Sequence, residues 1–170
     1  MTEQALPTDL HAESFFTADY AVVENGKLYI SGGAWNRIGH PSFPAVQAFA
    51  VAAILHIPWR AHGQNHGFVI WFEDADGQNI AGRVEGSFQA AVPPGALPGD
   101  YSVAPVAVNI NAFVFQRPGD YAAVLSLDGT EISRWRFRVA QTFGIPGAPT
   151  LPVAGGVSPP MDPTPDAPAE

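Results

Sequence analysis

The stretch "VVENGKLYISGGAW", Val22–Trp35, decides the fold class of this 170-residue chain. Two apolar arms flank the pair Asn25-Gly26. Asn-Gly is the strongest short signal for a two-residue hairpin turn, because both residues tolerate a positive φ. Side chains along each arm alternate between two faces, as they do in a β-strand. The stretch therefore predicts a β-hairpin whose second arm ends in two glycines and a tryptophan.

The rest of the chain repeats this pattern of apolar runs separated by Gly, Pro, Asn and Asp. We expect eight strands, at residues 16–23, 27–35, 45–57, 67–73, 78–89, 103–115, 120–127 and 130–139. No ten-residue window combines helical periodicity with caps. Short turns imply antiparallel neighbours, so we predict an all-β fold, a single antiparallel β-sandwich that is immunoglobulin-like or related. Tyr121, near a strand start, matches the tyrosine corner of such sandwiches.

The domain organisation follows from composition. We expect a loose N-terminal segment at residues 1–14, the β-sandwich domain at 15–142 and an acidic tail rich in Pro, Gly and Ala at 143–170. The tail has no basic residue and no aromatic one, so it cannot offset the entropy lost on ordering, and we expect it to be disordered. The alternative is a polyproline-like arm that docks on a partner or on another copy.

Charge and composition exclude several functions. The net charge is −8, from 16 acidic and 8 basic residues, and such a surface repels phosphate backbones, so we expect no nucleic-acid binding. The chain has no cysteine, which excludes disulfides and thiolate chemistry. No apolar run approaches the roughly 20 residues that span a bilayer, and no basic cluster precedes an apolar run at the N-terminus. We therefore expect no membrane contact and a cytoplasmic location, or a particle-associated one if the chain comes from a phage.

Catalytic and metal-binding motifs are missing. There is no nucleophile elbow, no HExxH, no GxGxxG and no Walker A sequence. His62 and His66 are four residues apart, but they lie in a predicted loop that fixes no geometry. The segment from Asp74 to Glu85 resembles a calcium loop only in length, and its Asp-Gly pair is better explained as a hairpin turn. We therefore expect no enzyme, no catalytic residues, no cofactor and no metal.

Three predicted strands are apolar on both faces. Residues 45–57 carry Phe49, Val51 and Leu55 on one face, and mostly alanine, with Val46 and Ile54, on the other. Residues 67–72 and 103–115 behave similarly, whereas a plain sandwich leaves its outer faces polar. Charged residues make up only 14% of the chain, against about 25% in a typical domain. The outer faces are therefore covered either by the chain's own segments or by an oligomeric or partner interface.

Five residues are candidates for a ligand or partner surface: Trp35, Trp59, Arg134, Arg136 and Arg138. Trp35 follows two glycines and is either a plug in the sandwich or a platform for a ligand. Trp59 follows a strand end. The three arginines share one face of the last strand. They either recognise an anion or an acidic partner, or they form local ion pairs and protect an edge strand from pairing with other chains.

The motif "ADYAVVENGKLYISGGAWNRI", residues 18–38, is the most specific part of the sequence, and "PVAVNI" and "PGDYAAVLSLDG" follow it in order. From about residue 15 to residue 139 the chain resembles a mostly actinobacterial family that is known only as a domain of unknown function. The resemblance implies one small β-domain. No activity is assigned to that family, so the resemblance implies no site residues.

These observations predict a non-catalytic interaction or assembly module that self-associates or docks a protein partner. One alternative is a β-sandwich that binds a small molecule or carbohydrate through Trp35 and Trp59. Another is a structural component of a phage or other particle.

Overall fold

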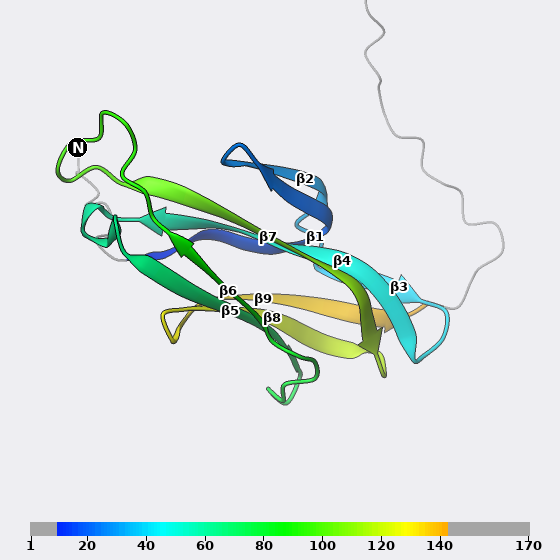
Figure 1. Cartoon of the computed structure of the whole chain (residues 1–170). Helices are drawn as coiled ribbons and strands as arrows, with labels where there is room; N and C mark the ends of the chain where they lie inside the picture. The colour runs from blue at the N-terminus through cyan, green and yellow to red at the C-terminus, as the bar shows by residue number, and fades with distance from the viewer. Residues whose placement is uncertain (1–9, 143–170) are drawn as a thin grey trace, which may run out of the picture.

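The computed structural model describes residues 10–142 and contains two packed β-sheets (Figure 1). Sheet A has the order β2-β1-β4-β7, and sheet B has the order β3-β9-β8-β5-β6. The strands of sheet A are β2 (Lys27–Gly33), β1 (His11–Glu24), β4 (Ala45–Ile57) and β7 (Ser102–Phe115). Those of sheet B are β3 (Arg37–His40), β9 (Thr130–Gln141), β8 (Gly119–Leu127), β5 (Asn65–Asp74) and β6 (Val84–Gln89). The predicted all-β sandwich is confirmed.

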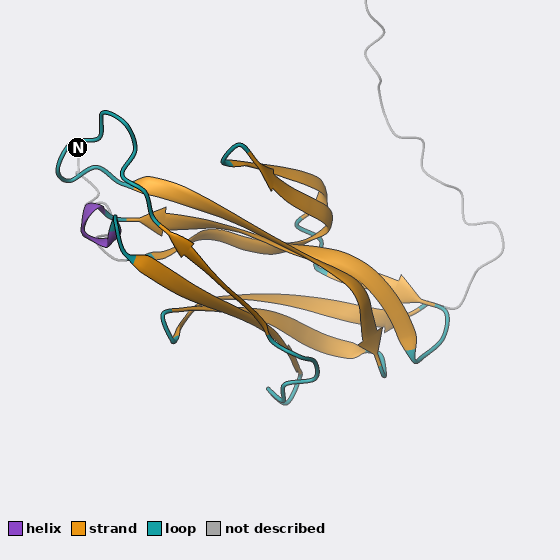
Figure 2. Cartoon of the chain, in the orientation of Figure 1, coloured by secondary structure: helices purple, strands orange, loops and turns teal. Residues whose placement is uncertain are grey.

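The one helix in the described residues is a single 3-10 turn, Trp59–Ala61, directly after β4. Figure 2 shows that strands dominate the described chain and that most loops lie at the ends of the sandwich. All neighbouring strands run antiparallel except β3 and β9, which are parallel.

The largest differences from the sequence prediction concern β3, β6 and β1. β3 was not predicted, because four residues around Gly39 cannot be told from a loop without their parallel partner β9. β6 begins at Val84 rather than at residue 78, since the turn after β5 extends further. β1 begins at His11, so the predicted loose segment 1–14 is wrong for its last four residues, which pair with β4 through their backbone. The predicted tail, 143–170, lies outside the described residues.

Phenylalanine rings form the centre of the core between the sheets. Phe49 of β4 is 1% exposed, and its ring lies 5.6–6.3 Å from four other phenylalanine rings. These rings belong to Phe72, Phe113, Phe115 and Phe137. The pairs with Phe72 and Phe113 are edge-to-face, and aromatic pairs add about 0.5–1.5 kcal/mol each beyond the burial of their surface. Aromatic packing therefore joins the two sheets at the centre of a core that also contains buried aliphatic side chains.

Tyr121 forms the corner that the sequence suggested. Its hydroxyl donates a hydrogen bond to the carbonyl oxygen of Arg117, four residues upstream, at 2.6 Å. Its ring packs on Phe115 and Phe137. This is the arrangement of a tyrosine corner, and it fixes the turn that enters β8.

The β1–β2 hairpin lies on the outer face of sheet A. β1 pairs with β4 up to Ala18, and beyond that point it pairs with β2 (Figure 1). Ala18 and Ala21 pack there against Ala50 and Ala52 of β4, and all four are 0% exposed. Alanine allows this close approach because its side chain is a single methyl group. The chain's own hairpin therefore covers part of the outer face of β4.

Asn109 of β7 fixes the hairpin in this position. Its Oδ1 accepts a hydrogen bond from the Ala21 N–H at 3.2 Å, and its Nδ2 donates one to the Ala21 carbonyl oxygen at 2.7 Å. The side-chain amide thus pairs with β1 as another strand's peptide group would. Both backbone polar groups of the fully buried Ala21 are satisfied by this one side chain.

We expect Asn109→Ala to destabilise the fold, because it leaves the N–H and C=O of Ala21 without partners. Each unsatisfied buried group costs about 1–3 kcal/mol. Urea denaturation followed by tryptophan fluorescence measures the change in the free energy of unfolding. Asn111→Ala is the matched control, since Asn111 is exposed as Asn109 is and lies two residues further along the same strand. Equal stability of the two variants would contradict this role of Asn109.

Candidate functional site

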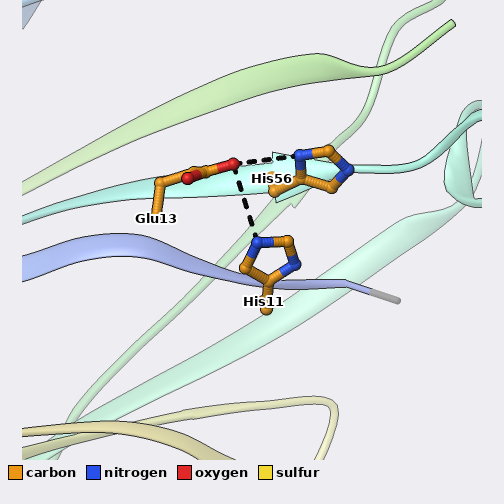
Figure 3. Close-up of side chains that lie close together, drawn as sticks. All are labelled: His11, Glu13 and His56. Atoms are coloured by element: carbon orange, nitrogen blue, oxygen red, sulfur yellow. Dashed lines mark hydrogen bonds and ion pairs between the residues drawn. The ribbon is translucent and has the colours of Figure 1, made fainter. Parts of the chain in front are cut away.

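Three side chains converge at one end of the outer face of sheet A: His11, Glu13 and His56 (Figure 3). His11 and His56 are register partners across β1 and β4. The β1–β4 register shifts between Ala12 and Ser14, which takes Glu13 out of the regular alternation. The Glu13 Oε1 atom lies 3.2 Å from His56 Nδ1 and 3.6 Å from His11 Nε2. We call these three residues the histidine–carboxylate cluster.

The cluster combines one buried group with two accessible ones. His56 is 2% exposed, and its ring is stacked between the rings of His11 and Tyr101, each at a centroid distance of 4.6 Å. The side chains of His11 and Glu13 are 29% and 47% exposed. Sequence reasoning missed this cluster because His11 and Glu13 fell in the segment expected to be loose. The His-x-Glu pattern directly before an apolar run is the signal that was present.

The His62–His66 pair is not brought together around a common point. His62 Nε2 lies 2.7 Å from the hydroxyl of Ser102. His66 is buried and donates from Nδ1 to Asp128 at 2.8 Å and from Nε2 to the carbonyl oxygen of Ala61 at 3.0 Å. Both ring nitrogens face acceptors, an arrangement that favours the doubly protonated imidazolium.

The environment of His66 shifts two pKa values. Burial disfavours the charged imidazolium, but the hydrogen bonds to Ala61 and Asp128 outweigh this effect, so the pKa of His66 is raised. The hydrogen bond from His66 is the main cause that lowers the pKa of Asp128. This pair ties the β5 start to the β8–β9 turn.

The glycines before Trp35 allow a close approach of side chain and backbone. Gly32 has φ +58°, and a Cβ atom there would fall 2.0 Å from the Asp19 carboxylate. After them the chain turns inward, and the ring of Trp35 packs edge-on against Phe49 and Phe137, each at 5.7 Å. Trp35 therefore lies where a plug between the sheets would lie.

Trp59 lies apart from Trp35. It is in the 3-10 turn beyond the C-terminal end of β4, and its ring meets that of His62 at 5.6 Å. Trp35, in contrast, packs against the core partway along β4. The structure does not bring the two tryptophans into one platform.

The three arginines of β9 lie on the outer face of sheet B, around a hollow of about 530 Å³. β8 pairs with β9 along most of its length, whereas β3 pairs with it only from Arg138 to Gln141. The interpretation that these arginines protect a sheet edge therefore does not hold at Arg138, where β3 takes the edge position. At Arg134 and Arg136 no described strand pairs with β9 on the side away from β8, so for these two residues it stays a prediction.

Two of these arginines form ion pairs. The acidic partners are Glu73 and Glu131 for Arg134, and Asp120 for Arg138 at 2.9 Å. The hydrogen bond from Arg134, followed by one from Trp71, lowers the pKa of Glu73. Among the residues from 10 to 142, Arg136 has no acidic partner. The local ion-pair interpretation thus describes Arg134 and Arg138, and Arg136 is the one left for a ligand or partner.

We expect Trp35→Ala to lower the free energy of unfolding by about 3–5 kcal/mol, as for other large aromatics removed from a core. Trp59→Ala should cost clearly less, because Trp59 does not pack against the main core cluster. Chemical denaturation followed by circular dichroism compares the two. A small loss for Trp35→Ala would exclude the plug and favour a ligand platform.

Asp128→Asn should reveal the pH dependence of the His66–Asp128 pair. The raised pKa of His66 gives stability that is complete below its ordinary value of 6.5 and is lost as the pH rises through the folded value. The lowered pKa of Asp128 gives stability that is lost as the pH falls below about 3.8. Asn keeps the acceptor for the Gly67 N–H and tolerates the positive φ at this position.

We therefore expect the variant to be destabilised more near about pH 5.5 than near about pH 8.5. The difference should stay below about 1 kcal/mol because Asp128 is partly exposed. Melting temperatures of both proteins at the two pH values measure it. The same loss of melting temperature at both pH values would show that the charges of His66 and Asp128 do not contribute to stability.

No helix within residues 10–142 has the length and apolar character needed to cross a bilayer. No curated protein matches the chain. A family model described as a family of unknown function, DUF6941, matches residues 13–140. That match covers well over half of the chain and almost the whole sandwich, from within β1 to within β9. The protein belongs to this family of unknown function.

Proposed function

We propose that this protein is a non-catalytic assembly module that self-associates through the outer face of sheet A. The observation that carries the proposal is the unequal charge of the two sheets. β4 and β7 contain no charged residue over 13 and 14 residues. The ion pairs of the β9 arginines lie instead on the outer face of sheet B.

Exposed apolar side chains follow the same division. Of the eleven large hydrophobic residues exposed in residues 10–142, ten belong to sheet A or to the loop before β7. Val46 and Val114 are cross-strand partners that are 64% and 44% exposed. Val103, near the other end of β7, is 55% exposed. An apolar surface of this extent, next to a charged one, is typical of an interaction face.

A second copy of the chain is the occupant that fits best. Each copy carries a net charge of −8, so two copies repel each other except where an uncharged surface is presented. A two-fold axis brings the same patch of each copy together, so the patch that contains Val46 and Val114 would meet the same patch of the second copy.

Contact through the face of sheet A is favoured over pairing of β7 edges. Pro105 offers no N–H to a neighbouring strand, and a register shift opposite Ala48 disrupts the ladder in the second half of β7. Both features discourage strand addition.

We expect the wild-type chain to form a dimer that dissociates on dilution, measured by light scattering coupled to size-exclusion chromatography. The double variant Val46→Lys/Val114→Lys should dissociate at least about tenfold more readily, because two lysines cannot be buried without partners. Ile80→Lys is the control, since Ile80 is exposed but lies outside sheet A. Circular dichroism confirms that each variant is folded.

A chain that stays monomeric at every concentration would overturn the proposal, as would an equal effect of Ile80→Lys. If the chain stays monomeric and binds a different protein, and the double lysine variant loses that binding, the face of sheet A is an interface for that protein. Self-association would then be wrong.

A further inference from the structure

We propose that the histidine–carboxylate cluster of His11, Glu13 and His56 binds a divalent transition-metal ion, with Zn²⁺ as the best match. Two imidazoles and one carboxylate are a ligand set of open zinc sites, in which a fourth position is left for water or another ligand. Imidazole nitrogens select such borderline metals over calcium and magnesium.

The distances in the cluster suit one ion. The three ligand atoms all lie within 4.8 Å of one another. The Glu13 oxygen is 3.2 Å and 3.6 Å from the two histidine nitrogens. Around a tetrahedral zinc ion with bonds of about 2.0–2.1 Å, neighbouring ligand atoms are roughly 3.3 Å apart. Two of the three separations therefore already have the length that coordination requires.

The third separation, between the ligand nitrogens of His11 and His56, shortens when the accessible side chains rotate. The His11 and His56 rings are stacked with 24° between their planes, so their lone pairs do not yet point to one position. His56 is held between His11 and Tyr101 and is 2% exposed. The side chains of His11 and Glu13 are partly exposed and lie at the irregular start of β1. On metal binding these two side chains would rotate toward Nδ1 of His56.

The position of Glu13 suits a shared ion. Its Oε1 atom faces one ring nitrogen of each histidine, so a single carboxylate oxygen is shared by both rings. A divalent ion placed among these three atoms would take the place of the protons that the ring nitrogens donate to the carboxylate.

The ion would join β1 to β4 at the end of sheet A. Because it binds the folded chain and not the unfolded one, it should stabilise the fold in proportion to the logarithm of its concentration. The site lies at one end of the face proposed for self-association, where Val103 is the register partner of His56. All three ligands come from one copy of the chain, so a monomer should bind the ion.

The test uses the full chain without a histidine tag. Isothermal titration with Zn²⁺ should give one site per chain, and the melting temperature should rise with zinc concentration. Co²⁺ serves as a spectroscopic probe, because its visible absorption reports coordination by nitrogen and oxygen in a site of low symmetry. His11→Gln and Glu13→Gln, which change accessible side chains, should each weaken zinc binding at least tenfold and abolish the cobalt spectrum.

His62→Gln is the matched control, because His62 lies outside the cluster and should leave zinc affinity unchanged. Circular dichroism of each metal-free variant checks its fold, and a variant that failed to fold would be replaced by His11→Asn. The proposal is overturned if zinc neither binds nor stabilises the wild type. It is also overturned if His11→Gln and Glu13→Gln bind zinc like the wild type, or if His62→Gln weakens binding as much as they do.

Discussion

The need to bury both faces of β4 governs the rest of the structure. One face of this strand carries Phe49 and packs into the aromatic core between the sheets. The other face carries Ala50 and Ala52, which are fully buried beneath the β1–β2 hairpin. β1 satisfies both demands, because its first half pairs beside β4 and its second half turns over it. The glycines before Trp35 then bring the chain back to the core.

Sequence patterns predicted the strands and turns whose structure depends on neighbouring residues alone. β4 was predicted with its observed bounds, since a long apolar run ends at Pro58, and Asn25-Gly26 marked the hairpin. β3 was missed because four residues acquire strand character only by pairing with β9, about a hundred residues away. The histidine–carboxylate cluster was missed for a related reason. Its members meet through the pairing of β1 with β4, and the polar start of β1 carries no apolar alternation that would predict a strand.

The low charge content of the chain is unevenly distributed in space. The acidic and basic side chains of the strands gather mainly on sheet B, where Arg134 and Arg138 are neutralised by neighbouring carboxylates. Sheet A presents alanine, valine and tyrosine, and its charged side chains lie in β1 and at the start of β2, whereas β4 and β7 carry none. The average composition therefore conceals two unlike surfaces. On sheet B the charges are neutralised by ion pairs, and sheet A carries the exposed apolar side chains.

The buried alanines beneath the hairpin form a cluster that shares no buried residue with the aromatic core. Two separate clusters allow part of the protein to unfold independently, because the loss of one cluster does not expose the other. The β1–β2 hairpin is the smaller unit, held by methyl contacts and by the amide of Asn109. We therefore expect it to be the part of the sandwich that opens first, in a local unfolding event that leaves the two-sheet core intact.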